Sequence, residues 1–311
     1  MPQISIVIPF SGCEKSLETT LVSVLENRPG RSEIIVAHPG NYSDPYELAD
    51  EVRFEALDPS QFSLAGVLSH LLPSIHAPVL HLLGCGVQVH PGWTQEATQS
   101  FEDAYVGSAC PVLLDQQDAI HSIGVENSTT YGNRFLARGK RLSKSEYTQY
   151  EPVGPSQLAA FYRTEGLRQI SCLTDFSDAL FGLEIGLSLE AIGFENRVIP
   201  SSVLTTRNEF PNGSGQVSQK AIWRFAGSMG FFLGLALSSL ATLEDLLRAP
   251  FSPGARQSLR QRLGHLVDTR SARAFTEFVD QAEGPLPEGA TLSLAQREWN
   301  LAGSTPERRA A

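Results

Sequence analysis

The chain has 311 residues, of which 41% are hydrophobic and 19% charged, a balance typical of a globular protein with a full apolar core. Its formal net charge of −10 argues against broad nucleic-acid binding, which depends on clustered Lys and Arg, but leaves room for a local basic pocket. The length predicts one large domain plus a smaller piece.

The four cysteines are widely spaced and include no C-x-x-C pair, so the sequence predicts no zinc site. They are Cys13, Cys85, Cys110 and Cys172. The N-terminus, MPQISIVIPF, enters a strand pattern directly and has neither the basic region nor the cleavage site of a signal peptide. We therefore expect a cytoplasmic protein with four reduced thiols.

The first third of the chain alternates buried strand patterns with helical ones. Residues 4–8 (ISIVI), 33–37 (EIIVA) and 78–83 (PVLHLL) are apolar runs typical of strands buried on both faces. Helical spacing covers 14–27 and 62–76. This order predicts a doubly wound α/β sheet whose ligands lie beyond the carboxyl ends of its strands. A short edge strand is expected at 52–57, and the strand ends lie at 9–12, 38–41 and 84–87.

Later segments predict shorter elements and a second region. Residues 104–125 mix short strands with turns, and the polar stretch 127–156 is interpreted as a loop over a site. A strand at 157–163, a helix at 179–192 and a short strand at 194–204 precede the linker PNGSG. The helical pattern beyond it includes the uncharged stretch 225–243, which favours a soluble or interface-packed helix, with a membrane-surface or dimer helix as the alternative.

The order of several short motifs resembles family-2 glycosyltransferases of the A type. That family begins with a strand V-S-V-I-I-P and a helix containing S-V-L, and this chain has SIVIP at 5–9 and SVL at 23–25. The family continues with E-I-I-V-V-D-D-G-S, which corresponds to EIIVAHPGN at 33–41. Its Asn/Asp-x-Asp motif, followed by P-G-W, corresponds to GCG at 84–86 and PGW at 91–93.

Further matches extend the resemblance over residues 3–204. They are VG at 106–107, PVLLD at 111–115, IHSIG at 120–124, LEIGLSL at 183–189 and GF at 193–194. The resemblance implies an α/β, Rossmann-like nucleotide-diphospho-sugar transferase fold with a mixed, mostly parallel central sheet over 1–210, followed by a C-terminal helical region over 216–311. It also implies transfer of a sugar from a nucleotide sugar to a hydroxyl of a glycan or lipid-linked acceptor.

The positions that bind the donor depart from the family pattern. The aspartate that contacts the nucleotide base is replaced by His38 or Pro39, and the two aspartates that hold Mg²⁺ or Mn²⁺ in the family are Gly84 and Gly86. We therefore expect no metal here, so that no cofactor is assigned. We expect Pro9, His38, Gly84 and Gly86 to line the nucleotide site, the glycines by letting backbone N–H groups approach phosphate.

The remaining candidate residues each have two interpretations. Glu184 aligns with the family's general base, or is a first-turn acid favoured by the helix dipole. Trp93 lines the acceptor side or is a packed core aromatic. The basic residues of the polar stretch clamp the leaving diphosphate in place of a metal, or belong to a solvated loop. They are Arg134, Arg138, Lys140, Arg141 and Lys144.

Three functions remain open from the sequence. The first is an inverting, metal-independent glycosyltransferase with Glu184 as base. The second is a catalytically inactive glycosyltransferase-like protein that binds a ligand, because base-contacting and metal-binding aspartates are lost together. The third is a scaffold whose 218–248 helix contacts a second copy or lies peripherally on the inner face of the membrane.

Overall fold

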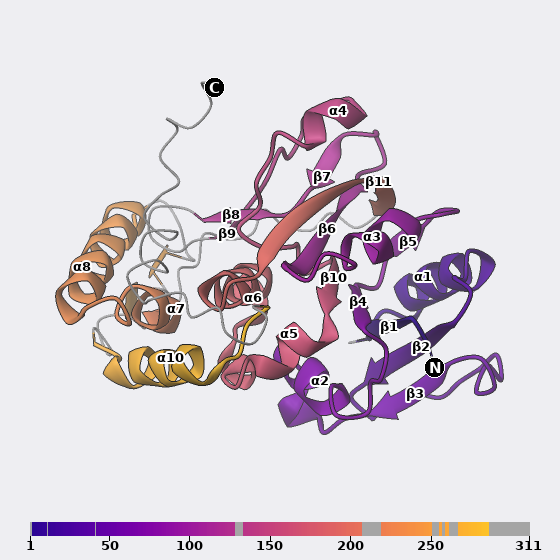
Figure 1. The fold of residues 1–311 in the computed structure, drawn as a ribbon, viewed down its shortest axis with the longest axis horizontal. Helices are drawn as coiled ribbons and strands as arrows, with labels where there is room; N and C mark the ends of the chain where they lie inside the picture. The colour runs from indigo at the N-terminus through magenta and orange to yellow at the C-terminus, as the bar shows by residue number, and fades with distance from the viewer. Residues whose placement is uncertain are drawn as a thin grey trace.

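The computed structural model describes residues 2–10, 12–40, 42–127, 133–206, 219–250, 255–256, 259–260 and 267–285. Its centre is a nine-stranded sheet in the order β3-β2-β1-β4-β10-β6-β11-β5, with β7 paired to β6 (Figure 1). The first four strands are parallel to one another. They are β1 (Ile4–Pro9), β2 (Ser32–His38), β3 (Arg53–Ala56) and β4 (Val79–Leu83).

The other half of the sheet mixes directions. Strand β10 runs antiparallel to both β4 and β6, whereas β6 and β11 are parallel to each other. A separate hairpin of β8 and β9 follows β7 in the chain. The strands of this half are β5 (Val87–Val89), β6 (Val106–Leu114), β7 (Ile120–Ser122), β8 (Val125–Asn127), β9 (Asn133–Phe135), β10 (Ala159–Arg163) and β11 (Glu195–Thr206).

Helices cover both faces of the sheet. They are α1 (Glu14–Glu26), α2 (Leu64–Leu71), α3 (Gln95–Ser100), α4 (Lys144–Tyr147), α5 (Thr164–Gln169), α6 (Phe181–Ala191), α7 (Gln219–Phe225), α8 (Phe231–Arg248) and α10 (Thr269–Gln281), with short 3-10 turns η1 (Pro59–Gln61), η2 (Leu173–Asp175) and η3 (Asp178–Leu180). Because neighbouring strand residues point to opposite faces, Ile6 and Ile8 pack in the core on the α1 side, whereas Val7 packs with α2 and α6.

The C-terminal helices add to the core on the α6 side. Figure 1 shows α7 beside α6, with α8 and α10 around it, and the same core cluster contains Phe225 of α7 and both Phe275 and Phe278 of α10. The apolar stretch 225–243 is not one helix, because α7 ends at Phe225 and α8 begins at Phe231. Among the described residues, no helix has the length and hydropathy needed to cross a membrane.

The fold class predicted from the sequence is confirmed: parallel α/β strands in the first half, a mixed sheet overall and helices at the C-terminal end. The strand expected as short at 194–204 is instead the twelve-residue β11, which crosses two irregularities in its pairing with β6. The helix expected at 62–76 is shorter: α2 begins after the N-cap Ser63, whose Oγ accepts a hydrogen bond from Gly66 N at 3.0 Å, and it ends at Leu71. The linker PNGSG lies outside the described residues.

Candidate functional site

The carboxyl ends of β1, β2 and β4 meet at one edge of the sheet, as the sequence predicts. The backbone N–H of Phe10 donates to the carbonyl of Ala37 at 2.8 Å, which joins the end of β1 to the end of β2. The thiol of Cys85 donates to the carbonyl of Pro9 at 3.2 Å, which joins the end of β1 to the segment after β4. Pro9, His38 and Gly84 are thus brought to one edge, where ligands of such sheets bind.

The rings of His38, Phe10 and Phe54 gather around Tyr42 at this edge. The ring of Tyr42 lies edge-on to Phe10 and His38, with centroids 5.2 Å and 5.7 Å away, and stacks on Phe54 of β3 at 5.5 Å. Burial lowers the pKa of His38, so its imidazole is neutral at pH 7. These aromatic residues were not predicted as site residues; the signal that could have identified them is their position, just beyond the ends of the first two strands and on the third.

The amides of Gly84 and Gly86 are engaged within the protein. Gly84 N–H donates to the carbonyl of Leu158 at 2.7 Å, and Gly86 N–H donates to Ser16 O at 3.0 Å and Thr20 Oγ1 at 2.8 Å. Contrary to the prediction, neither amide is available to a phosphate in this conformation. The two glycines pin the end of β4 to α1 and to the start of β10.

A divalent cation of the kind this fold family uses does not fit these residues. Neither glycine offers a ligand, and burial raises the pKa of the Cys85 thiol to about 12, which keeps it protonated. A carboxylate would also be hard to place: Gly86 has φ of +88°, and a Cβ at Gly84 would come within 3.1 Å of Leu158 O. Among the described residues, no group of three or more His, Cys, Asp or Glu side chains is placed to hold a metal.

Glu184 lies at the start of α6, where the sequence predicts a first-turn acid, but its carboxylate is closed off. Its Oε1 is 2.6 Å from Arg224 of α7, and its Oε2 accepts from Ser177 N at 2.7 Å. The Arg224 guanidinium also lies over the Phe176 ring, 4.7 Å from its centroid. Burial raises the pKa of Glu184 and the charge of Arg224 opposes that rise. The role of general base stays a prediction, and it requires Arg224 to move.

Trp93 belongs to the core rather than to an open acceptor side. It is 2% exposed, its indole N–H donates to Asn27 O at 3.2 Å, and its ring packs against His81 and Phe161. A cavity of about 350 Å³ that it borders also involves Gln3 and residues 27–30, at the amino ends of β1 and β2. That is the opposite edge from His38, so the interpretation as a packed aromatic is the one the structure supports.

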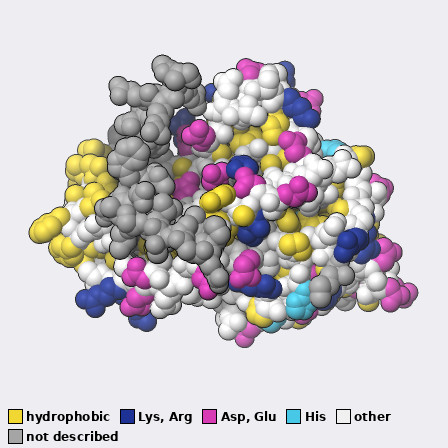
Figure 2. All heavy atoms as spheres, viewed as in Figure 1, with side chains coloured by type: hydrophobic (Ala, Val, Ile, Leu, Met, Phe, Trp, Pro, Cys, Tyr) yellow, Lys and Arg dark blue, Asp and Glu magenta, His cyan; other side chains and the backbone are white. Residues whose placement is uncertain are grey.

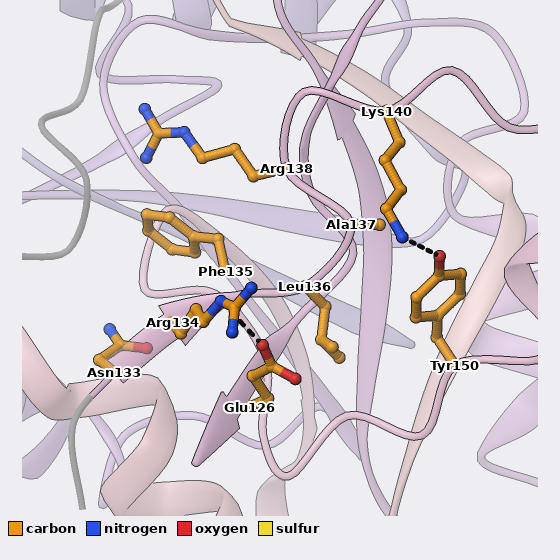
Figure 3. A pocket seen from close by; sticks show the side chains of 9 residues that line it. All are labelled: Glu126, Asn133, Arg134, Phe135, Leu136, Ala137, Arg138, Lys140 and Tyr150. Atoms are coloured by element: carbon orange, nitrogen blue, oxygen red, sulfur yellow. Dashed lines mark hydrogen bonds and ion pairs between the residues drawn. The ribbon is translucent and has the colours of Figure 1, made fainter. Parts of the chain in front are cut away.

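Three of the predicted clamp cations line one cavity of about 530 Å³ (Figure 3). Arg134 Nε is 3.1 Å from Glu126, Lys140 Nζ donates to the Tyr150 hydroxyl at 3.1 Å, and the Arg138 guanidinium lies 5.5 Å from the Phe135 ring centroid. The cavity is lined by Glu126, Asn133, Arg134, Phe135, Leu136, Ala137, Arg138, Lys140 and Tyr150. Arg141 and Lys144, predicted with them, do not line it.

Contacts of Asn133, Gln157 and Leu158 connect this cavity to the end of β4. The amide of Asn133, a lining residue in β9, donates to Gln157 Oε1 at 3.5 Å and to Ala179 O at 3.1 Å, just before α6. Leu158, next to Gln157, accepts from Gly84 N–H. The cation cavity, which we call the β9 pocket, is therefore linked through one residue pair to the strand end where a donor would bind.

Two further residues at the strand ends were not foreseen as site residues. Cys13, at the N-cap of α1, is exposed, and hydrogen bonds from the side chain and backbone of Ser16 lower its pKa. His90 Nε2 lies 3.2 Å from Thr205 Oγ1. The sequence places His90 far from Thr205, and only the pairing of β5 with β11 brings them together.

Comparisons with known proteins agree with this geometry at the level of the fold. No protein-family model and no curated protein matches the sequence. The crystal structure of GalNAc-T7 with UDP, GalNAc and Mn²⁺ is similar over 90% of this chain and 56% of its own, with a TM-score of 0.55 and 14% identity. The mannosyltransferase PcManGT from Pyrobaculum calidifontis, in complex with GDP-Man and Mn²⁺, is 12% identical, with a TM-score of 0.47 over 90% of this chain and 84% of its own.

The protein therefore has the A-type, nucleotide-diphospho-sugar transferase fold. It spans just over half the length of the GalNAc-T7 chain that it matches. Because a fold hosts many activities, the likeness establishes the architecture and leaves the function to the residues of the site.

Proposed function

We propose that this protein is an inverting glycosyltransferase that binds a nucleotide-sugar donor at the carboxyl ends of β1, β2 and β4, without the usual divalent metal. The observation that carries the proposal is the group of rings around Tyr42, which includes His38, at the sheet edge where ligands of such sheets bind. The ring of Tyr42 offers a stacking surface to a nucleotide base, and His38 replaces the family's base-contacting aspartate with a neutral imidazole.

The proposed reaction is a single displacement. An acceptor hydroxyl oxygen forms a bond to the anomeric carbon while the bond to the diphosphate oxygen breaks, and the nucleotide diphosphate leaves with that electron pair. The hydroxyl proton passes to Glu184, after α7 has withdrawn Arg224 from it. Stabilising the leaving diphosphate without a metal requires positive charge close to the strand ends.

The first experiment is a calorimetric titration of the full chain with UDP, GDP, dTDP and CDP, each with and without Mn²⁺. The proposal expects one nucleotide to bind with equal affinity in both conditions. Tyr42→Ala is expected to weaken binding about tenfold or more, from the loss of stacking. Tyr46→Ala is the matched control, because Tyr46 belongs to the same segment but is exposed and donates to Glu18. Binding that requires Mn²⁺ would contradict the metal-independent site.

A second candidate is a catalytically inactive relative that binds the nucleotide or a glycan. The observation that favours it is the complete burial of Glu184 against Arg224, which leaves no open carboxylate at the position of the family's base. A transfer assay separates the two candidates. Turnover of a bound nucleotide sugar that Glu184→Gln abolishes, with nucleotide affinity unchanged, supports the enzyme. Nucleotide binding with neither hydrolysis nor transfer supports the inactive relative.

A further inference from the structure

The β9 pocket concentrates positive charge in an acidic protein. Its lining contains three cationic side chains and one carboxylate, whereas the whole chain carries a net charge of −10. The three cations come from β9 and the turn that follows it, and they face one cavity (Figure 3). A locally positive pocket in a negatively charged protein attracts an anionic ligand.

Two of the three cations have fixed contacts before any ligand arrives, and the third is weakly paired. Lys140 is fixed by its hydrogen bond to Tyr150, over whose ring it also lies at 5.5 Å, and Arg138 packs against Phe135. Arg134 pairs with Glu126 while 76% exposed, and an exposed pair of this kind contributes little to stability. An incoming carboxylate or phosphate can therefore displace Glu126 from Arg134 at small cost.

The rest of the lining suits a sugar ring better than a bare anion. A cavity of about 530 Å³ is larger than a phosphate group needs. Tyr150 provides a partly exposed ring surface and Glu126 a carboxylate with which sugar hydroxyls hydrogen bond, whereas Phe135 and Asn133 are only 6% and 4% exposed. Aromatic walls with a few polar groups are the usual composition of a small-molecule site.

We propose that the β9 pocket binds an acidic saccharide, with the sugar ring against Tyr150 and its carboxylate or phosphate among the cations that line the pocket, Arg134, Arg138 and Lys140. We assign this saccharide as the acceptor for a donor bound at the strand ends, because Asn133, Gln157 and Leu158 connect the pocket to the end of β4. This inference rests on the proposed function, because it names the acceptor class of that transfer. Carboxylate and phosphate share the chemistry that the pocket recognises.

The test is an NMR titration of the full chain with glucuronate, glucose 6-phosphate, glucose and inorganic phosphate. We expect at least one acidic sugar to bind at least tenfold more tightly than glucose, as charge-assisted hydrogen bonds require. The preferred acid identifies the source of the anion. Phosphate binding as tight as that of glucose 6-phosphate would overturn the saccharide part of the proposal, and equal binding of glucose would overturn the acidic part.

Substitutions locate the binding. Arg138→Gln and Lys140→Gln are each expected to weaken binding of the acidic sugar about tenfold or more. Lys144→Gln is the matched control, since it removes the same charge from the same segment outside the pocket, and it should leave affinity unchanged. Urea midpoints equal to that of the parent chain show that the variants remain folded. Equal weakening in all three variants would overturn the proposal in favour of a non-specific charge effect.

Nucleotide titrations of the same variants separate this inference from the diphosphate clamp. Unchanged nucleotide affinity in Arg138→Gln and Lys140→Gln supports an acceptor pocket, and a parallel loss of nucleotide affinity overturns it in favour of the clamp. Nucleotide binding without any binding of acidic sugars would overturn the inference and leave the proposed function standing. Binding of acidic sugars without binding of any nucleotide supports the pocket and contradicts the donor site.

Discussion

The guanidinium of Arg224 lies 2.6 Å from the carboxylate of Glu184, and the two side chains are 2% and 1% exposed. The pair joins α6, at the heart of the nucleotide-sugar-transferase fold, to α7 of the C-terminal helices. Arg224 also donates to Asp175 O at 3.3 Å and covers the Phe176 ring. The C-terminal helices are thus held against the one retained candidate for the catalytic base.

Removing Arg224 is expected to be strongly destabilising, because it leaves a buried carboxylate without a compensating charge. We expect Arg224→Met to lower the free energy of unfolding by about 3–5 kcal/mol, measured by urea denaturation. The double variant Glu184→Met, Arg224→Met should recover most of that loss. Arg248→Met is the control: its partner Glu244 lies on the exposed face of α8, so the change should cost less than about 1 kcal/mol. A double variant as unstable as the single one would contradict this account.

The ion pair between Glu184 and Arg224 could not be predicted from the sequence. The acid at the start of α6 was predicted from a local pattern, but its partner lies 40 residues further along the chain, and no local periodicity encodes such a contact. The strands β1, β2 and β4 were predictable because parallel strands buried on both faces are continuous apolar runs. The three-residue β5 and the six-residue α3 and α5 were missed, since elements this short show no resolvable period.

Some features of the candidate site were predictable from the sequence and others were not. The convergence of Pro9, His38 and Gly84 was predictable, because the carboxyl ends of parallel strands meet at one edge. The loss of the metal ligands was also visible in the sequence, as a glycine has no side chain. The occupation of the Gly84 and Gly86 amides was not, because their acceptors come from α1 and β10. Composition predicted a basic loop, and tertiary packing gathers three of its cations around one cavity.

Two buried histidines predict a loss of stability in mild acid. Burial lowers the pKa of His81 to about 3, although a backbone hydrogen bond with Ala160 opposes this shift. Burial also lowers the pKa of His121 to about 4; the charge of Arg138 lowers it further and the charge of Asp115 opposes the shift. The unfolded chain binds a proton at each imidazole near pH 6.5, and the folded chain does not. The contribution of these two histidines to the free energy of unfolding is therefore fully present above about pH 6.5. It falls as the pH drops toward 4, by up to about 1.4 kcal/mol per pH unit for each histidine.

Urea denaturation at pH 7.5, 6 and 5 measures this slope. We expect His81→Leu to reduce the slope by up to about 1.4 kcal/mol per pH unit, because it removes one group that is protonated only in the unfolded chain. Glu190, whose pKa burial raises to about 7, contributes a slope of the opposite sign, and it does so equally in both chains. His76→Leu is the control, since His76 is exposed, and it should leave the slope unchanged. The same pH dependence in His81→Leu as in the parent chain would show that His81 is not the group responsible.

Cys13 provides a chemical probe of the proposed donor site. Its pKa is lowered by hydrogen bonds from Ser16, whose hydroxyl lies 3.2 Å from the sulfur, whereas burial raises the pKa of Cys85 to about 12 and of Cys172 to about 11. Because the thiolate is the reactive form, iodoacetamide at pH 7.5 should modify Cys13 first, as read by peptide mass spectrometry. A nucleotide bound at the carboxyl end of β1 should slow that reaction.

Ser16→Ala tests the cause of this reactivity. Loss of the hydroxyl raises the pKa of Cys13 toward its ordinary value, so its modification should slow while Cys85 stays unreactive. A nucleotide that binds by calorimetry yet leaves the rate at Cys13 unchanged would place the nucleotide away from the strand ends. That result would count against the donor site proposed here, independently of any transfer assay.

The outer face of α8 predicts association with a surface or a second copy. Figure 2 shows hydrophobic side chains gathered over α8, and Phe232 is 84% exposed and Leu247 68%. The exposed large hydrophobics here are Met229, Phe231, Phe232, Leu233, Leu240, Leu243, Leu246 and Leu247. A contiguous apolar face of this kind marks an interaction site in a globular protein.

We expect the double variant Phe232→Ser, Leu247→Ser to abolish this association. The free energy of unfolding, measured with urea, should stay within about 0.5 kcal/mol of the parent, since both side chains are exposed to solvent. Sedimentation over a range of protein concentrations reports self-association, and flotation with neutral and anionic vesicles reports lipid binding. Deleting the whole C-terminal region cannot serve instead, because Phe225, Phe275 and Phe278 fill the main core and their loss would unfold the chain. A parent chain that stays monomeric and ignores both kinds of vesicle would show that α8 is exposed without a partner of either kind.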